Sequence, residues 1–302
     1  MSEENEKKKL DRDFQQWRLM LETVTGASHD RQNLPNQDHG DFYQPNENSL
    51  PIILAISDGH GSAKSFRSDR GSKFAVETAI ELLQVLVAPE SDRQNISEVN
   101  NHVNDEFCKK IVSRWKEKVD NDLKNEDFTS AELENLEQEE GTKVRQSFEN
   151  NKEDCKYIVY GATLLAVLVT ENYHLYLQLG DGDILTVDTL GNTIRPIPKD
   201  ENLIANETYS LCMKDAWKYI NNCFVTSKPE MILVSTDGYA NSFDSEENFI
   251  KIGKDYLDMI CQQGFDEVAA QLKGFLEQTS QAGSGDDITF GLIKSGLTQT
   301  RR

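Results

Sequence analysis

Short hydrophobic runs separated by polar turns occur near both ends of the chain and through its centre. The run 51–57 (PIILAIS) is continuously hydrophobic, as expected for a strand that is buried on both faces. Residues 17–24 predict another strand, and 231–238 (MILVSTDG) and 287–293 (DITFGLI) predict two more. Between 161 and 194, strand-like runs alternate with polar turns, which indicates an antiparallel meander.

Hydrophobic residues at helical spacing predict three helices. One covers 74–86, and a second runs from Val99 to Val119 with an apolar residue at every fourth position. A third, amphipathic helix is predicted around 268–276. Strands grouped together and helices grouped together favour an α+β fold over a doubly wound parallel sheet.

The remaining segments are polar. Residues 1–15 are dense in charge and lack apolar periodicity, so we expect a polar tail there and a second short tail at 297–302. Residues 120–155 are rich in acidic residues with few apolar positions, and we interpret them as a surface excursion. Residues 16–296 are then expected to form one domain that includes this excursion.

Composition narrows the classes of function. The chain has 302 residues, of which 52 are acidic and 32 basic, and its formal net charge of −20 repels both nucleic acid and anionic membrane surfaces. Five cysteines without a C-x-x-C pair indicate neither a disulfide framework nor a zinc site. The N-terminus does not resemble a signal peptide, and the apolar runs are far shorter than the roughly 20 residues of a membrane span. We therefore expect a reduced, cytoplasmic protein that binds neither nucleic acid nor membranes.

Aspartates recur where predicted strands end. Asp58, Asp181 and Asp237 are each followed by glycine, and Asp286 comes just before the last predicted strand. One Asp-Gly is typical of a plain turn. Four such acids, with no basic residue beside them, favour a site for a hard cation such as magnesium or manganese. His60, two residues after Asp58 in AISDGHGS, is well placed to donate a proton at neutral pH.

Six motifs follow one another along the chain: GASHDRQNLPNQD (26–38), SDGHGSAKSFRSDRGSKFAVE (57–77), GATLLAVLV (161–169), LGDGDILTV (179–187), ILVSTDGYANSF (232–243) and GDDITFGLI (285–293). In these motifs the chain resembles the metal-dependent serine/threonine protein phosphatases of type 2C. The form of the first motif and the short segment 206–211 are most similar to the bacterial branch, which lacks a long flap.

The resemblance implies a four-layer sandwich, two antiparallel β-sheets flanked by α-helices, with two Mn²⁺ or Mg²⁺ ions at one end of the sheets. Asp58 would bridge the two ions, Asp181 would belong to a third, weaker site, and His60 matches the general acid. The implied metal-binding residues are Asp38, Asp58, Gly59, Asp181, Asp237 and Asp286. The implied activity is hydrolysis of phosphoserine and phosphothreonine in a phosphorylated protein, in a pathway with a cognate serine/threonine kinase.

Two positions depart from the family pattern. Gln37 stands before Asp38 where the animal enzymes of the family usually carry a carboxylate, so the cluster has one negative charge fewer. The phosphate-binding arginine expected five residues before Asp38 is Asn33 here. Arg31, in the same loop, is therefore a candidate for binding the substrate phosphate. The metal ions alone are a second candidate, and His29 or another residue is a third.

Two rival interpretations remain from the sequence. The Asp-x-Asp at Asp181 and Asp183 is also found in haloacid dehalogenase phosphohydrolases, although there it normally opens the domain. The substitutions at Gln37 and Asn33 also allow a catalytically weak phosphatase fold that serves as a regulatory or phosphopeptide-binding module. The retention of Asp58, His60, Asp237 and Asp286 argues against that second alternative.

Overall fold

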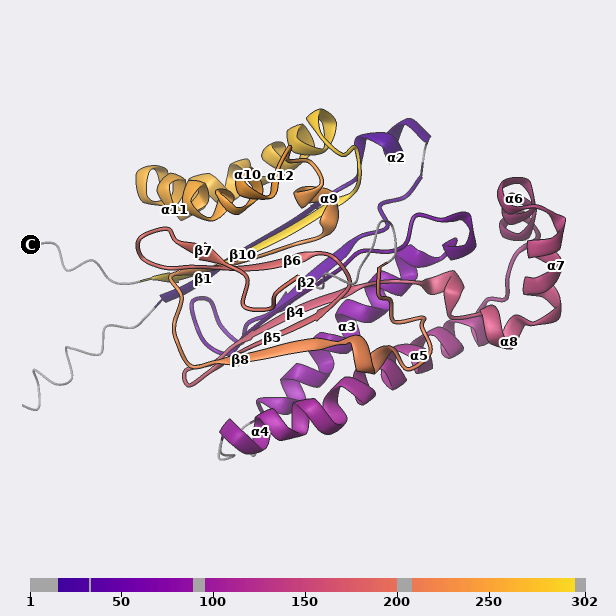
Figure 1. Cartoon of the computed structure of the whole chain (residues 1–302), viewed down its shortest axis with the longest axis horizontal. Helices are drawn as coiled ribbons and strands as arrows, with labels where there is room; N and C mark the ends of the chain where they lie inside the picture. The colour runs from indigo at the N-terminus through magenta and orange to yellow at the C-terminus, as the bar shows by residue number, and fades with distance from the viewer. Residues whose placement is uncertain (1–15, 33, 89–95, 200–207, 297–302) are drawn as a thin grey trace, which may run out of the picture.

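Two five-stranded antiparallel sheets lie face to face at the centre of the molecule (Figure 1). The computed structural model describes residues 16–32, 34–88, 96–199 and 208–296. In spatial order, the first sheet contains β1 (Gln16–Val24), β10 (Ile288–Gly296), β9 (Met231–Ser235), β6 (Asp183–Val187) and β7 (Thr193–Ile194). The second contains β2 (His39–Tyr43), β3 (Ile52–Ser57), β4 (Leu164–Val169), β5 (His174–Leu179) and β8 (Asn221–Val225).

Helices cover the outer face of each sheet and complete four layers (Figure 1). The second sheet packs against α3 (Ser68–Leu86), α4 (Ile96–His102), a π-helical turn (Val103–Phe107) and α5 (Cys108–Asn125). The first sheet packs against α10 (Glu246–Ile250), α11 (Ile252–Gln263) and α12 (Phe265–Ala282). The expected fold class is therefore confirmed.

The inner strands are hydrophobic on both faces because each sheet is covered on both sides. Every residue of β3, β4 and β9 is buried. Alternate residues of β3 point into different cores: Ile53 joins the helix-covered core, and Leu54 joins the core between the sheets. Such continuous apolar runs are expected of strands without a solvent face.

The strands predicted at 17–24, 51–57, 231–238 and 287–293 correspond to β1, β3, β9 and β10. The meander of 161–194 is divided between the sheets, because β5 pairs with β4 in one sheet and β6 pairs with β9 in the other. The turn containing Asp181 therefore crosses from one sheet to the other. That position places its carboxylate between the two layers at one end of the sandwich.

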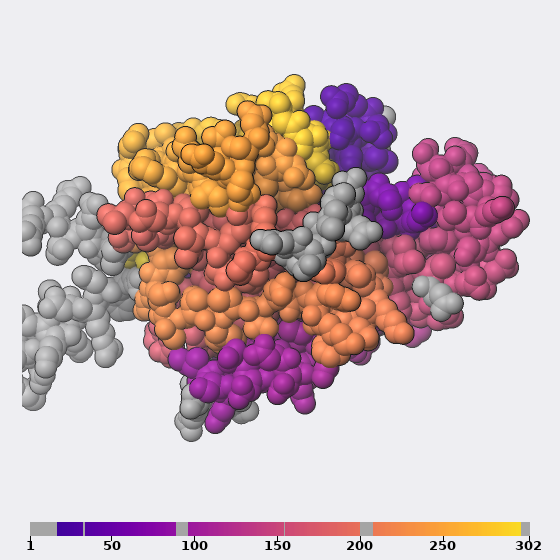
Figure 2. Space-filling view, viewed as in Figure 1, coloured from indigo at the N-terminus to yellow at the C-terminus, as the bar shows by residue number. Residues whose placement is uncertain are grey.

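The acidic stretch after α5 is helical, which its polar composition did not indicate. It forms α6 (Ser130–Glu140), α7 (Thr142–Asn150) and α8 (Lys152–Cys155), here called the α6–α8 lobe. Figure 2 shows this lobe projecting at one end of the molecule. Only Leu136 of α6 and Phe148 of α7 are buried, so few apolar positions are enough to attach it. The expected tails at 1–15 and 297–302 lie outside the described residues, and the domain limits remain a prediction.

Candidate metal centre

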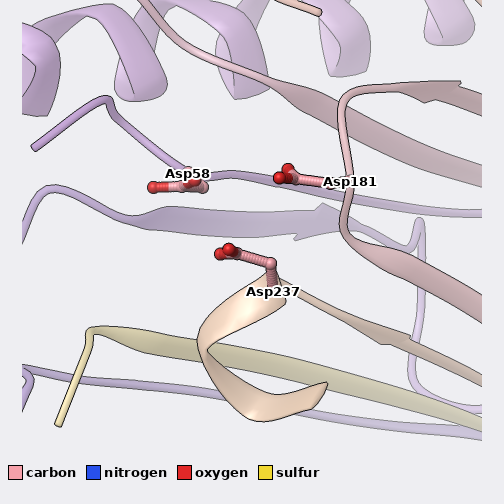
Figure 3. A group of neighbouring side chains, drawn as sticks. All are labelled: Asp58, Asp181 and Asp237. Atoms are coloured by element: carbon pink, nitrogen blue, oxygen red, sulfur yellow. The ribbon is translucent and has the colours of Figure 1, made fainter. Parts of the chain in front are cut away.

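Three of the strand-end aspartates meet at one end of the sandwich. Asp58 directly follows β3, Asp181 lies in the turn between β5 and β6, and Asp237 is the first residue of α9 (Asp237–Ala240), just after β9. Each contributes a carboxylate oxygen within 4.8 Å of the other two. Figure 3 shows the three side chains pointing toward a common space.

Backbone contacts hold Asp58 at this position. Its N–H donates to Thr163 Oγ1 at 3.0 Å, and the Thr163 N–H donates to the Asp58 carbonyl at 2.9 Å. Gly59 then pairs with Ala162 across an isolated bridge. A Cβ on Gly59 would lie 2.6 Å from the carbonyl oxygens of Gln37 and Ser68, so only glycine fits there.

Two further aspartates border the cluster. Asp38 is buried behind it, where the Thr236 hydroxyl donates to its Oδ2 at 2.7 Å. Burial raises the pKa of Asp38 to about 8, and the negative charges of Asp287 and Asp237 act in the same direction. Asp286 lies before β10 with its side chain 50% exposed, and it lines the same pocket as Asp58.

Neighbouring groups do not fully neutralise the negative charge of the clustered carboxylates. Burial raises the pKa of Asp58 well above its ordinary value, and the charges of Asp38, Asp237 and Asp181 raise it further. Burial and the same kind of repulsion raise the pKa of Asp237 to about 7. Converging carboxylates with raised pKa values are stabilised in the ionised form by a bound cation, and oxygen ligands are those that magnesium and manganese prefer. The residues present therefore fit the metal ions that the sequence implies.

A pocket of about 510 Å³ opens over the carboxylates. His60 lines it, and its ring lies against the backbone of Gly161, where an added Cβ would be 2.4 Å from His60 Cδ2. Burial lowers the pKa of His60. The lining residues are His29, Gln37, Asp58, Gly59, His60, Gly61, Gln178, Gly180, Asp181, Lys199, Thr208, Asp237, Ala240, Asn241, Asp286 and Asp287.

The structure adds Asp287 to the residues expected at the site. Asp287 is buried, and its carboxylate accepts the N–H groups of Gly26 at 2.6 Å and Gln37 at 2.7 Å. It also lies 3.0 Å from Nδ1 of His29, whose Nε2 is 4.0 Å from Asp286 Oδ1. Asp287 thus joins the loop before β2 to the loop before β10. The only sequence signal for it was its place beside Asp286.

In the segment before Asp38, Arg31, the first candidate for phosphate binding, lies outside the acidic pocket, whereas His29 lies at it. His29, in the short helix α2 (Ala27–Gln32), lines the acidic pocket. Arg31 is exposed and lines a separate hollow with Lys273 and Glu277. Asn33 lies outside the described residues. The assignment of Arg31 to phosphate binding remains a prediction, and its position outside the pocket lining weighs against it.

Asp183, the second acid of the Asp-x-Asp pair, has a different environment. It is buried and pairs with Arg195. Burial raises its pKa, while the Arg195 guanidinium lowers it. Asp183 is therefore part of a structural ion pair and does not line the pocket described above.

The sequence profile of the protein phosphatase 2C family matches residues 25–277. The chain belongs to this family, which confirms the resemblance found in its motifs and leaves no support for the haloacid dehalogenase interpretation. No curated protein matches the chain. The expected short flap segment, 206–211, lies partly outside the described residues.

Solved structures of bacterial proteins, serine/threonine phosphatases among them, have a similar fold. A serine/threonine phosphatase from S. agalactiae is 16% identical, with a TM-score of 0.54, and the match covers 93% of this chain and 100% of that one. PppA, described as a key regulatory component of the type VI secretion system in Pseudomonas aeruginosa, is 14% identical, with a TM-score of 0.53 and coverage of 93% and 98%. Mycobacterium tuberculosis PstP/Ppp is 14% identical, with a TM-score of 0.52 and coverage of 92% and 98%. At these identities the likeness shows the fold.

Among the described residues, no helix has the length and apolar character needed to cross a membrane.

Proposed function

We propose that the chain is a metal-dependent protein serine/threonine phosphatase that hydrolyses phosphoserine and phosphothreonine by an activated water. The observation that carries the proposal is the convergence of Asp58, Asp181 and Asp237 at the floor of a polar pocket. Membership of the protein phosphatase 2C family supports it. So does the fold shared with the catalytic domain of PstP, whose structure contains two manganese ions.

The carboxylates would hold two Mn²⁺ or Mg²⁺ ions. The residues that would hold them are Asp58, the Gly59 carbonyl, Asp237 and Asp286. Asp38 would support the pair from behind, and Asp181 would serve a third, weaker site. Bound divalent cations lower the pKa of a water molecule and neutralise charge on the phosphate.

His60 is proposed to deliver a proton to the leaving seryl or threonyl oxygen. It lines the pocket beside the carboxylates, and Gly161 supports its ring from one side. Protonation matters because an alkoxide is a poor leaving group. His29 and Lys199 also line the pocket and are proposed to contact the phosphate, since both offer nitrogen donors.

Turnover of 4-nitrophenyl phosphate by the full chain tests the proposal. Activity should require Mn²⁺ or Mg²⁺ and be lost with chelator. Asp58→Asn should remove it while the circular dichroism spectrum stays unchanged. Asp188→Asn is a matched control, because Asp188 is an exposed acid whose carboxylate accepts N–H groups in the β6–β7 turn.

A folded wild-type protein without turnover would support the alternative, a catalytically weak module that binds phosphopeptides or regulates a partner. Gln37 is the observation that keeps this alternative open, because it lines the pocket without adding a negative charge. If the enzyme is active, a serine/threonine kinase must supply its phosphoprotein substrate. The cytoplasmic location expected from the sequence remains a prediction.

A further inference from the structure

Arg67, which immediately precedes α3, is a charged residue with only 1% of its side chain exposed. Each of its five guanidinium N–H groups has an acceptor, an arrangement that fixes a single side-chain geometry. Nε donates to Glu132 Oε1 (2.6 Å), one terminal nitrogen donates to Glu132 Oε2 and the Asp127 carbonyl (both 2.9 Å), and the other donates to the Glu126 carbonyl (2.8 Å) and Tyr160 Oη (2.9 Å).

These bonds attach the start of the α6–α8 lobe to the segment that follows the metal centre. Glu132 has a second role, because it forms the capping box of α6 with Thr129. Two further contacts join the same segments: Lys64 pairs with Glu140 at 3.0 Å, and Phe66 packs edge-on against Phe128. The beginning and the end of α6 are therefore both tied to residues 64–67.

A continuous series of contacts leads from Arg67 to His60. Arg67 N–H donates to the Val159 carbonyl at 3.0 Å, and its guanidinium holds Tyr160 Oη. The next residue, Gly161, packs against the His60 ring, and its carbonyl accepts the His60 N–H at 3.0 Å. Residues 159–161 thus lie between the buried guanidinium and the histidine.

We propose that Arg67 and Glu132 are positioning residues for His60: they fix residues 159–161 against its ring, so that helix α6 controls how the histidine is directed into the pocket. This inference rests on the proposed function, in which His60 is the general acid. Neither residue lines the pocket, and each acts through Tyr160 and Gly161. Loss of the Glu132 charge would leave Asp122, 3.8 Å from the guanidinium, as the remaining carboxylate beside Arg67, so the buried charge would be less completely paired.

Glu132→Gln tests the proposal, with Thr129→Ala as its matched control. The substituted amide keeps the shape of the side chain and can still cap α6, but it loses the charged contact to Arg67. Thr129→Ala removes the hydroxyl half of the same capping box, including its bond to Glu132 Oε2, and leaves the Thr129 N–H and the Arg67 guanidinium as donors to Glu132. Turnover is measured with a phosphoserine peptide, which needs the general acid, and with 4-nitrophenyl phosphate, which does not.

We expect Glu132→Gln to lower kcat for the phosphopeptide about tenfold or more, because proton delivery is typically worth about 10²–10⁴-fold. The kcat for the aryl phosphate should change less than about twofold, and the KM values of both substrates should stay unchanged. Thr129→Ala should leave the ratio of the two kcat values at the wild-type level. In a His60→Gln background, adding Glu132→Gln should cause no further loss. Equal losses on both substrates, or additive losses with His60→Gln, would overturn the proposal.

Hydrogen exchange tests the coupling between Glu132 and the segments around His60 without relying on catalytic activity. Glu132→Gln should speed exchange in peptides covering 58–67 and 159–161, and Thr129→Ala should not. An inactive wild-type protein with this exchange pattern would contradict the proposed function and leave the structural coupling supported. An active wild-type protein with unchanged exchange would overturn the coupling alone.

Discussion

The His60 ring is mostly buried but faces the pocket, and the missing side chain of Gly161 leaves the space that the ring occupies. Any side chain at Gly161 would overlap the histidine, since an added Cβ would lie 2.4 Å from Cδ2. Burial also lowers the pKa of His60, which makes its protonated form a stronger acid. These features are consistent with a residue that delivers a proton at a defined place.

We therefore expect His60→Gln to reduce turnover of a phosphoserine peptide about 100-fold or more, because general acid catalysis typically contributes about 10²–10⁴-fold. Turnover of 4-nitrophenyl phosphate should fall much less, since its leaving group needs little protonation. Steady-state kinetics on both substrates checks this. Equal losses would instead identify His60 as a residue that supports the metal centre.

We expect His29, and not Arg31, to contribute to binding of the substrate phosphate. His29 lines the acidic pocket, and Arg31 lines a different hollow. We expect His29→Ala to raise KM for the phosphopeptide about tenfold with a modest change in kcat, as for lost uniform binding. Arg31→Ala should leave KM unchanged. If Arg31→Ala raises KM and His29→Ala does not, both measured at saturating Mn²⁺, Arg31 would be identified as the phosphate-binding residue.

Local sequence was enough to predict the strand-end aspartates of this site. Asp58, Asp181 and Asp237 each follow an apolar strand, and the ends of packed strands come together wherever the sheets do. Asp287 was not predicted, and His29 was named only as one candidate for phosphate binding, because the contact between them joins positions about 260 residues apart. Only the folded chain shows that these two loops meet.

At the scale of elements, the α6–α8 lobe was predicted only as a polar excursion. Its hydrophobic pattern is weak, since α6 buries Leu136 alone. The capping box of Thr129 and Glu132 was a readable helix signal within the acidic run. The attachment of the lobe through Arg67 depends on tertiary contacts and had no such signal.

Two helical glycines provide a matched test of the packing between elements. In α3, a Cβ on Gly71 would lie 1.9 Å from the Tyr160 carbonyl oxygen, whereas in α12 a Cβ on Gly274 would meet nothing within 4 Å. Gly71→Ala should lower the free energy of unfolding by about 1–3 kcal/mol, because the helix must move away from residues 158–160. Gly274→Ala should raise it by about 0.5–1 kcal/mol through higher helix propensity. Urea denaturation measures both, and stabilisation by Gly71→Ala would contradict the close packing of α3.

At the scale of the whole molecule, blocks of strand-like and helical apolar pattern predicted an α+β class, whereas the four-layer arrangement of two sheets was implied only by the resemblance to the family. The distribution of the strands between the sheets was less accessible. The turn at Asp181 has the composition of an ordinary hairpin, yet it crosses between layers. This crossing brings Asp181 to the other carboxylates.

The buried carboxylates should make the stability of the metal-free protein depend on pH. The pKa is raised to about 8 for Asp38 and to about 7 for Asp237, from an ordinary value near 3.8. A raised pKa means that the folded state binds more protons, so stability falls as pH rises from about 4 to about 8. Each group contributes a slope of about 1.4 kcal/mol per pH unit within its window.

Urea unfolding in chelator between pH 5 and 8 measures this slope. Saturating Mn²⁺ should remove most of it, because the ions stabilise the ionised carboxylates. Asp38→Asn in chelator should reduce the slope, since the amide does not titrate. A metal-free protein that becomes more stable as pH rises would contradict this electrostatic account of the centre.

The most direct test of the central claim is release of inorganic phosphate from a phosphoserine peptide by the full chain. With saturating Mn²⁺, we predict steady multiple turnover that stops on addition of chelator and resumes when excess Mn²⁺ is restored. Asp237→Asn, folded by circular dichroism, should release no phosphate above background under the same conditions. Release that persists in chelator, or that survives Asp237→Asn at the wild-type rate, would contradict a metal-dependent phosphatase centred on these aspartates.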